Sequence, residues 1–219
     1  MIRVKLSHLT EYTYDHAVAL SPHIVRLRPA PHTRTHIESY ALAIEPEKKF
    51  VNWQQDPFAN WQARVVFPDR ARKLSVRVEI VAHMQVFNPF DFFVEEYAAT
   101  FPFSYEAALA KELTPYLAPS EDNANLKAFV AGFKGKGLRI VDMVVAANRY
   151  IKEHVSYVIR LEPGVQSAAE TLALKSGSCR DSAYLLVQLF RHLGLAARFV
   201  SGYLIQLKSD GPAEESGIT

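Results

Sequence analysis

The chain has 219 residues, enough for one large domain or two small ones. Its 25 basic and 23 acidic residues nearly balance, so the charge gives no case for a nucleic-acid partner. The single cysteine excludes a disulfide within the chain, and without a secretory signal we expect a cytoplasmic location. The longest apolar runs are far shorter than the ~20 residues that cross a bilayer, so we expect a soluble protein without a membrane partner.

The first ninety residues are predicted to be β-rich. Apolar and polar residues alternate from Ile2 to Tyr14, toward a turn expected at Asp15 and His16. A hairpin is expected around the turn-rich tip at 56–60. Further strands are predicted at 24–27, 37–44, 50–54, 60–67 and 74–87. Six or seven strands joined by short polar turns predict an antiparallel sheet or sandwich as a first domain, residues 1–90.

The second half of the chain has a helical pattern. Proline-containing breaks at 88–91 and 101–104 predict a linker over residues 91–104, followed by a second domain over 105–219. Helices are predicted at 105–113, 123–133, 138–155 and 167–175, with a brief extended segment at 157–159. Beyond a further helix, Gly194 is expected as a left-handed cap, residues 197–207 as a strand and 208–219 as a polar loop.

The sole cysteine, Cys179, lies at a predicted helix start. Ser178 and Asp181 have the S-x-x-D spacing of a capping box, which makes Ser178 the N-cap and Cys179 the first helical residue. The helix macrodipole favours a thiolate at this end. The residues from 183 to 193 are apolar on nearly every face, so we expect a buried helix that holds the cysteine still.

A lone cysteine is more often a small buried hydrophobe than a nucleophile. The position of Cys179 argues against that interpretation, because the thiol lies outside the apolar run, between Ser178 and Arg180. The sequence therefore predicts an accessible thiol.

Two stretches around the cysteine carry a family resemblance. The run from Glu170 to Val187 (ETLALKSGSCRDSAYLLV) and the run from Leu193 to Tyr203 (LGLAARFVSGY) closely resemble the bacterial transglutaminase-like proteins. The start of the chain is similar to the N-terminal region of the same family, in HLTEYTY at 8–14 and in the tip at 56–60. That tip carries Ala59 where the family usually has glycine.

The resemblance implies an α+β fold in which the β-rich, sandwich-like domain precedes the helical half of a papain-like core. It also places Cys179 on the nucleophile of the family. The thiolate would attack an amide carbonyl, form a thioester and pass the acyl group to water or to an amine. The implied partner is a peptide or protein amide, with no cofactor and no metal.

An oxyanion in such a reaction needs hydrogen-bond donors. The backbone amides of Cys179 and Arg180, unpaired at a helix N-terminus, are candidates. The side chains of Gln166 and Tyr157 are further candidates, although a turn amide and an ordinary strand aromatic are the preferred interpretations of these two. Ser178 and Asp181 are assigned to the helix cap.

The family histidine lies in a His-Ala-Trp type segment beyond a strand that ends near Leu207, and its aspartate lies further on. The resemblance therefore implies a core truncated before both, and we expect the 219 residues to be inactive or nearly so alone. His192 lies about 20 Å from Cys179 along the same helix and is excluded as a base. His154 is expected to bond the last carbonyls of its helix.

A non-enzymatic binding or scaffold module with a degenerate thiol fold is the alternative function. The pair Trp53 and Trp61 could then form a recognition surface, although aromatics that flank a tip more often pair across a hairpin.

Overall fold

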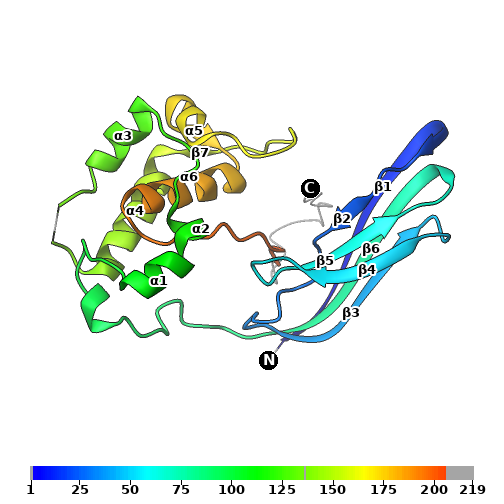
Figure 1. Cartoon of the computed structure of the whole chain (residues 1–219), viewed down its shortest axis with the longest axis horizontal. Helices are drawn as coiled ribbons and strands as arrows, with labels where there is room; N and C mark the ends of the chain where they lie inside the picture. The colour runs from blue at the N-terminus through cyan, green and yellow to red at the C-terminus, as the bar shows by residue number, and fades with distance from the viewer. Residues whose placement is uncertain (1, 136, 206–219) are drawn as a thin grey trace. The chain divides into compact units, whose positions relative to one another are not determined.

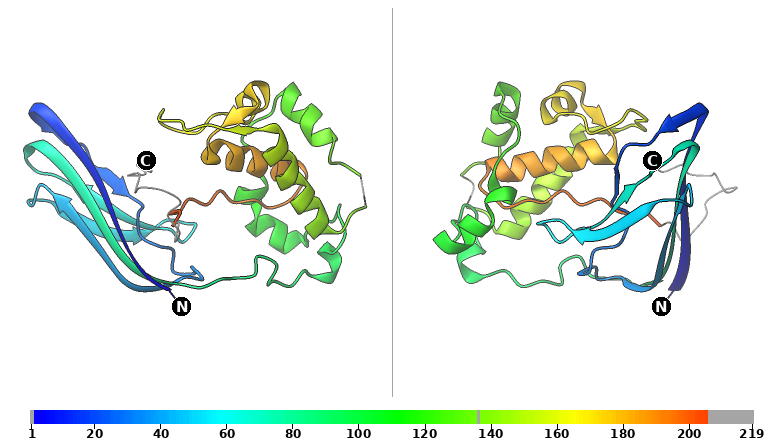
Figure 2. Two further views of the ribbon diagram at one scale, coloured as in Figure 1. Left: turned by 180° about the vertical axis from the view of Figure 1, so that it is seen from behind. Right: turned by 45° about the vertical axis from the view of Figure 1, so that its right-hand side comes forward.

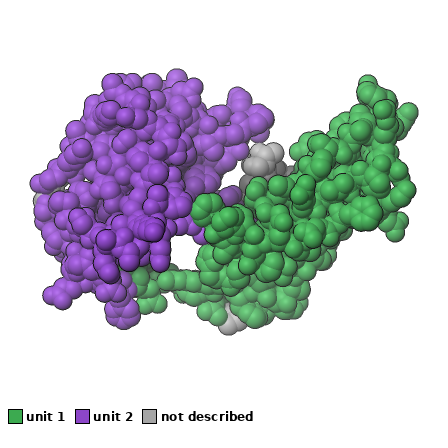
Figure 3. Space-filling view, in the orientation of Figure 1, with its two compact units in different colours: residues 1–92 green, residues 93–219 purple. Residues whose placement is uncertain are grey.

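The computed structural model describes residues 2–135 and 137–205. The chain divides into two compact units, residues 1–92 and residues 93–219 (Figure 3). Each unit has its own core and is described by itself.

Residues 2–92 form six strands, as Figure 1 shows: β1 (Ile2–Ala19), β2 (His23–Val25), β3 (His36–Glu45), β4 (Phe50–Gln55), β5 (Trp61–Val66) and β6 (Arg70–Met84). They make two antiparallel sheets with the strand orders β1-β6-β3 and β2-β5-β4. Ile44 and Leu74 from the first sheet share one buried cluster with Ala63 and Val65 from the second. The predicted antiparallel sandwich is thus confirmed.

The turn predicted at Asp15 and His16 is wrong, because β1 continues to Ala19. Its register with β6 shifts between Thr13, which pairs with Lys73, and Val18, which pairs with Ala71. The extra residues form an irregularity of the bulge type, in which unpaired residues are accommodated within a strand.

The hairpin tip between β4 and β5 is built around Asp56. Its carboxylate accepts hydrogen bonds from the backbone N–H of Phe58 and of Asn60, each at 2.9 Å, and from Asn60 Nδ2 at 2.8 Å. Ala59 has a φ of 61°, in the left-handed region that favours glycine. This conformation explains why a glycine is the usual residue at this position in the family that the sequence resembles.

The predicted cross-strand contact between the two tryptophans is present. The rings of Trp53 and Trp61 meet edge to face with centroids 6.5 Å apart, and Tyr40 contacts Trp53 in the same way at 6.1 Å. The guanidinium carbon of Arg28 lies 4.5 Å from the ring centroid of Trp61 and 5.3 Å from that of Trp53. Stacked cations of this kind stabilise an aromatic cluster.

The second unit is mainly helical. Its described elements are the 3-10 turn η1 (Glu96–Ala98), α1 (Ala107–Glu112), α2 (Thr114–Leu117), α3 (Ala124–Ala131), α4 (Ile140–His154), β7 (Ser156–Tyr157), α5 (Ala168–Leu174), β8 (Ser176–Gly177) and α6 (Cys179–His192). Helix α6 runs through the middle of this unit (Figure 2, orange). Leu185 and Leu189 of α6 are buried against Leu126 of α3, Ile151 of α4 and Ala168 of α5. The prediction that this helix is buried is confirmed.

Part of the predicted linker belongs to the second unit. Phe101 is 3% exposed and packs against Met143 and Leu195. Its backbone N–H donates to the carbonyl of Leu138 at 2.8 Å. The buried Phe101 ring therefore holds part of the segment that the prolines had predicted to be a linker.

The strand predicted at 197–207 is wrong over its described part, because residues 195–205 form neither strand nor helix. The backbone N–H and carbonyl of Ala197 bond to residues of α2 and α6 and not to a neighbouring strand. Its N–H donates to the carbonyl of Tyr116 at 3.0 Å, and its carbonyl accepts from the guanidinium of Arg191. Gly194 before it has a φ of 79°, as a left-handed cap requires. Residues 206–207 and the loop predicted at 208–219 lie outside the described residues.

In the part of the chain that the structure describes, no helix is both long and apolar enough to cross a bilayer. No group of three or more His, Cys, Asp or Glu side chains among the same residues is placed to hold a metal ion.

Candidate active site

Helix α6 begins at Cys179, and Ser178 occupies the N-cap with extended backbone angles, where the sequence predicts them. Cys179 is exposed, whereas each residue from Arg180 to His192 is buried or half-buried. The first intrahelical bond here runs from Ser182 N–H to the Ser178 carbonyl, at 3.1 Å. The N–H groups of Cys179 and Arg180 therefore have no acceptor within the helix. An accessible thiol thus lies beside backbone donors.

The residue that holds this helix start together is Asp181. Its side chain is 0% exposed. One carboxylate oxygen accepts from Ser178 N–H at 2.7 Å and from Ser178 Oγ at 2.8 Å. The other accepts from Gln166 N–H at 2.7 Å and from Arg160 Nη1 at 2.8 Å. The carboxylate therefore joins the helix cap to the loop that precedes α5.

These contacts keep Asp181 ionised despite its burial. Burial alone raises the pKa of the Asp181 carboxyl, but the N–H groups of Gln166 and Ser178 and the Arg160 guanidinium lower it to about 2. The hydrogen bond that Arg160 donates to Asp181 in turn raises the pKa of the guanidinium. The site thus contains an ion pair between a buried carboxylate and a largely covered guanidinium, and the carboxylate lies two residues after the cysteine.

Position 177 requires a glycine because the side chain of Asp181 lies close to its backbone. A Cβ at this position would lie 2.8 Å from the Asp181 Cβ, closer than side chains pack. The same segment is fixed on its other side by parallel pairing of β8 with β7, and Val158 N–H donates to the Gly177 carbonyl at 3.0 Å. The residues that lead into Cys179 are therefore held on both sides.

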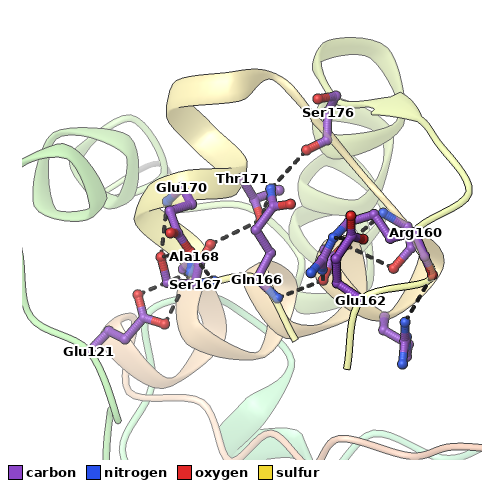
Figure 4. A network of polar contacts seen from close by, with 12 residues as sticks. Glu121, Arg160, Glu162, Gln166, Ser167, Ala168, Glu170, Thr171 and Ser176 are labelled. Carbon is purple, nitrogen blue, oxygen red and sulfur yellow. Dashed lines mark hydrogen bonds and ion pairs between the residues drawn. The ribbon is translucent and has the colours of Figure 1, made fainter. Parts of the chain in front are cut away.

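Gln166 is part of this support. Its side-chain Nε2 donates to the Ser176 carbonyl at 3.0 Å and to Thr171 Oγ1 at 3.3 Å (Figure 4). Both amide hydrogens are thus used within the network. The contacts favour a structural role for Gln166 over that of an oxyanion donor.

The loop also carries the start of α5. Ser167 and Glu170 form a reciprocal capping box there, and the carboxylate of Glu121 accepts the N–H of Ala168 at 3.0 and 3.1 Å (Figure 4). The loop that supplies Arg160 and Gln166 to Asp181 is therefore anchored at its far end too.

The histidines of residues 93–219 are His154 and His192, and each has a partner elsewhere. His154 Nδ1 lies 2.8 Å from the Tyr150 carbonyl, and its ring stacks on Tyr150 with centroids 3.8 Å apart. His192 Nε2 lies 2.7 Å from the Glu121 carbonyl. His154 bonds a carbonyl of its own last turn, as the sequence predicts.

Arg160 is the site residue that the sequence did not reveal. It lies 21 positions before Asp181, and no local motif links the two. The capping box accounts for the hydrogen bonds of Asp181 to Ser178 only, so the S-x-x-D spacing predicts no further partner.

A thiol at the start of a buried helix, in an α+β chain that opens with antiparallel sheets, agrees with what the family resemblance implies. Residues 4–83 match the model of the bacterial transglutaminase-like N-terminal region. Residues 127–215 match the model of the transglutaminase-like superfamily. The chain therefore combines these two regions, and the resemblance to the bacterial transglutaminase-like proteins is confirmed.

Similar proteins extend the comparison to nearly the whole chain. Uncharacterized proteins of Mycobacterium tuberculosis and Mycobacterium bovis are 25% identical over 209 residues, which cover 92% of this chain. The chain spans 66% of the length of these relatives.

A solved structure has the same fold. The crystal structure of "a Putative Cysteine Protease from Cytophaga hutchinsonii" aligns with a TM-score of 0.58 at 18% identity. The alignment covers 87% of this chain and 63% of that one. At this identity the likeness shows the fold alone.

Proposed function

We propose that the protein is a transglutaminase-like cysteine enzyme that transfers the acyl group of an amide through a thioester on Cys179. The observation that carries the proposal is that Cys179, the first residue of α6, is exposed. The other residues of this helix are buried or half-buried. A structural cysteine would be expected in the apolar core, away from the cap.

The reaction assigns a role to each group. The Cys179 thiolate attacks the amide carbonyl, and the N–H groups of Cys179 and Arg180 donate to the oxyanion that forms. Collapse of the tetrahedral intermediate releases the amine, which takes up a proton, and leaves the acyl group on sulfur. Water or a second amine then attacks the thioester and regenerates the thiol.

The reaction needs a group that first removes a proton from the thiol and then donates one to the leaving amine. A histidine usually does both. His154 and His192 are engaged with backbone carbonyls. We therefore assign proton transfer to the family histidine, which the resemblance implies beyond the segment that ends near Leu207. We expect activity from the full-length protein and little or none from residues 1–219 alone.

The test measures amide turnover by the full-length protein, with casein as the acyl donor. Hydrolysis is followed by peptide release, and transfer is followed by incorporation of a biotinylated alkyl amine. We expect one of these activities in the wild type and none in Cys179→Ala at equal folded fraction. Turnover that persists in Cys179→Ala would remove the cysteine from the mechanism. Cys179-dependent turnover by residues 1–219 alone would show instead that the base lies within them.

The binding-module alternative makes a different prediction that needs no substrate. An activated thiol reacts with iodoacetamide well below the ordinary thiol value of about pH 8.5. Reaction of Cys179 only at ordinary thiol pH in the full-length protein, together with no turnover, would favour the scaffold.

A further inference from the structure

We propose that Arg160 is a positioning residue for Cys179, which holds Asp181 in place and neutralises the negative charge that the helix-start motif brings close to the nucleophile. This inference rests on the proposed function in one respect, namely that Cys179 reacts as a thiolate.

The need for such a residue follows from the motif itself. Asp181 caps the helix, since it accepts both the N–H and the Oγ of Ser178. It also lies two residues after Cys179, on the same helical turn. An unpaired carboxylate there would repel a thiolate and cancel part of the benefit of the helix N-terminus. The motif that fixes the nucleophile therefore carries an electrostatic cost.

Arg160 has the geometry to remove that cost. Its Nη1 lies 2.8 Å from the Asp181 carboxylate, and the two side chains are 18% and 0% exposed. A charge pair this far removed from water is screened little, so the guanidinium compensates the carboxylate directly. Arg180 strengthens the arrangement, because its Nη2 donates to the Arg160 carbonyl at 3.3 Å. The residue after the nucleophile thus ties down the same loop.

Two acidic side chains, those of Glu162 and Glu170, also act on Arg160. Glu162 Oε2 lies 3.5 Å from Arg160 Nε and is 71% exposed, so solvent screens it. Glu170 acts on Arg160 without a direct contact and is bound to Ser167 at the start of α5. Both carry the same charge as Asp181 and cannot act as its counterion. Among the described residues, Arg160 is thus the cation that contacts Asp181.

A purely mechanical role for Arg160 is the competing explanation. In that case the loss of any of its contacts would disturb the helix start in the same way, whatever the charge of the replacement. A charge role predicts instead that lysine preserves the effect, that glutamine does not, and that removal of the Asp181 charge acts in the opposite direction.

The experiment measures the rate of iodoacetamide alkylation of Cys179 at pH 7 in the full-length protein, located by peptide mass spectrometry. We expect Arg160→Gln to slow alkylation by roughly 3- to 10-fold, while Arg160→Lys stays within about 2-fold of wild type. Asp181→Asn should accelerate it, and the double variant should return toward wild type. Lys127→Gln, which removes one positive charge from an exposed ion pair near α3, is the matched control and should have no effect.

Equal slowing in Arg160→Lys and Arg160→Gln would overturn the inference in favour of a mechanical role. An unchanged rate in Arg160→Gln would also overturn it. If Arg160→Gln does not fold, slower alkylation in Asp181→Asn is the contradicting result. Because the readout is the relative alkylation rate, these outcomes stand apart from the proposed function, which fails only if amide turnover does not depend on Cys179.

Discussion

Two aspartates organise the two units of this chain in different ways. Asp56 at the tip of the first unit is satisfied by its own neighbours, the backbone of Phe58 and the backbone and side chain of Asn60. Asp181 in the second unit accepts from Ser178 nearby but also from Gln166 and Arg160, which lie 15 and 21 residues away. The first aspartate makes a turn, whereas the second joins distant segments around the cysteine.

The difference lies in burial. Hydrogen bonds to the side chain and backbone of Asn60 lower the pKa of Asp56, as the contacts of Asp181 lower its own. Only Asp181 has lost contact with solvent, so only Asp181 needs a charged partner. Water can replace the hydrogen bonds of a carboxylate at an exposed turn, but it cannot reach a buried carboxylate.

The largest expected effect comes from Asp181→Ala. It leaves the Arg160 guanidinium without its buried partner and the α6 cap without its acceptor, so we expect a loss of about 3–5 kcal/mol in the free energy of unfolding. Urea denaturation followed by circular dichroism measures it. The matched variant Asp56→Ala should cost clearly less, because solvent replaces the lost bonds at the tip. Equal losses in the two variants would contradict the contrast between the two sites.

The second prediction concerns acid. The folded pKa of Asp181, about 2, lies below the ordinary value of 3.8, since its hydrogen bonds and Arg160 outweigh the opposing effect of burial. Its contribution is therefore fully present above about pH 4 and is lost as the pH falls toward 2, by on the order of 1–2 kcal/mol. Denaturation at a series of pH values should show this loss in the wild type, and Asp181→Asn should show a smaller slope over that window. Identical slopes would argue that Asp181 is not the group that titrates.

The smallest effect sharpens the comparison at the tip. Ala59 adopts a φ of 61°, which costs alanine more than glycine, so Ala59→Gly should raise the free energy of unfolding by up to about 1 kcal/mol. Thermal melting detects such a change. The control is Ala173→Gly in α5, where an exposed helical alanine is replaced and a small loss is expected. A loss at both positions would mean that Ala59 is not strained.

Local features of the fold were predictable from the sequence. Strand alternation gave the antiparallel first unit, and the S-x-x-D spacing gave the start of α6 at Cys179. These features depend on neighbouring residues. What the sequence missed depends on partners distant along the chain, namely the pairing of Arg160 with Asp181 and the packing of Phe101 on Met143.

Two errors have a related cause. Residues 197–205 have strand-like alternation but no ladder, because a strand also needs a neighbour, and Ala197 is bonded to Tyr116 and Arg191. Asp15 and His16 have the composition of a turn, but β1 continues through them with a shift in its register with β6. In both places composition was a weaker determinant than the surrounding hydrogen bonds.

The measurement that tests the central claim most directly is detection of the acyl-enzyme. Full-length protein is mixed with casein, quenched in acid and digested, and the peptide that contains Cys179 is analysed by mass spectrometry. We predict an acyl adduct on the Cys179 sulfur that neutral hydroxylamine removes and that is missing in Cys179→Ala. Amide turnover with no adduct at Cys179, or with an unchanged rate in Cys179→Ala, would contradict the account.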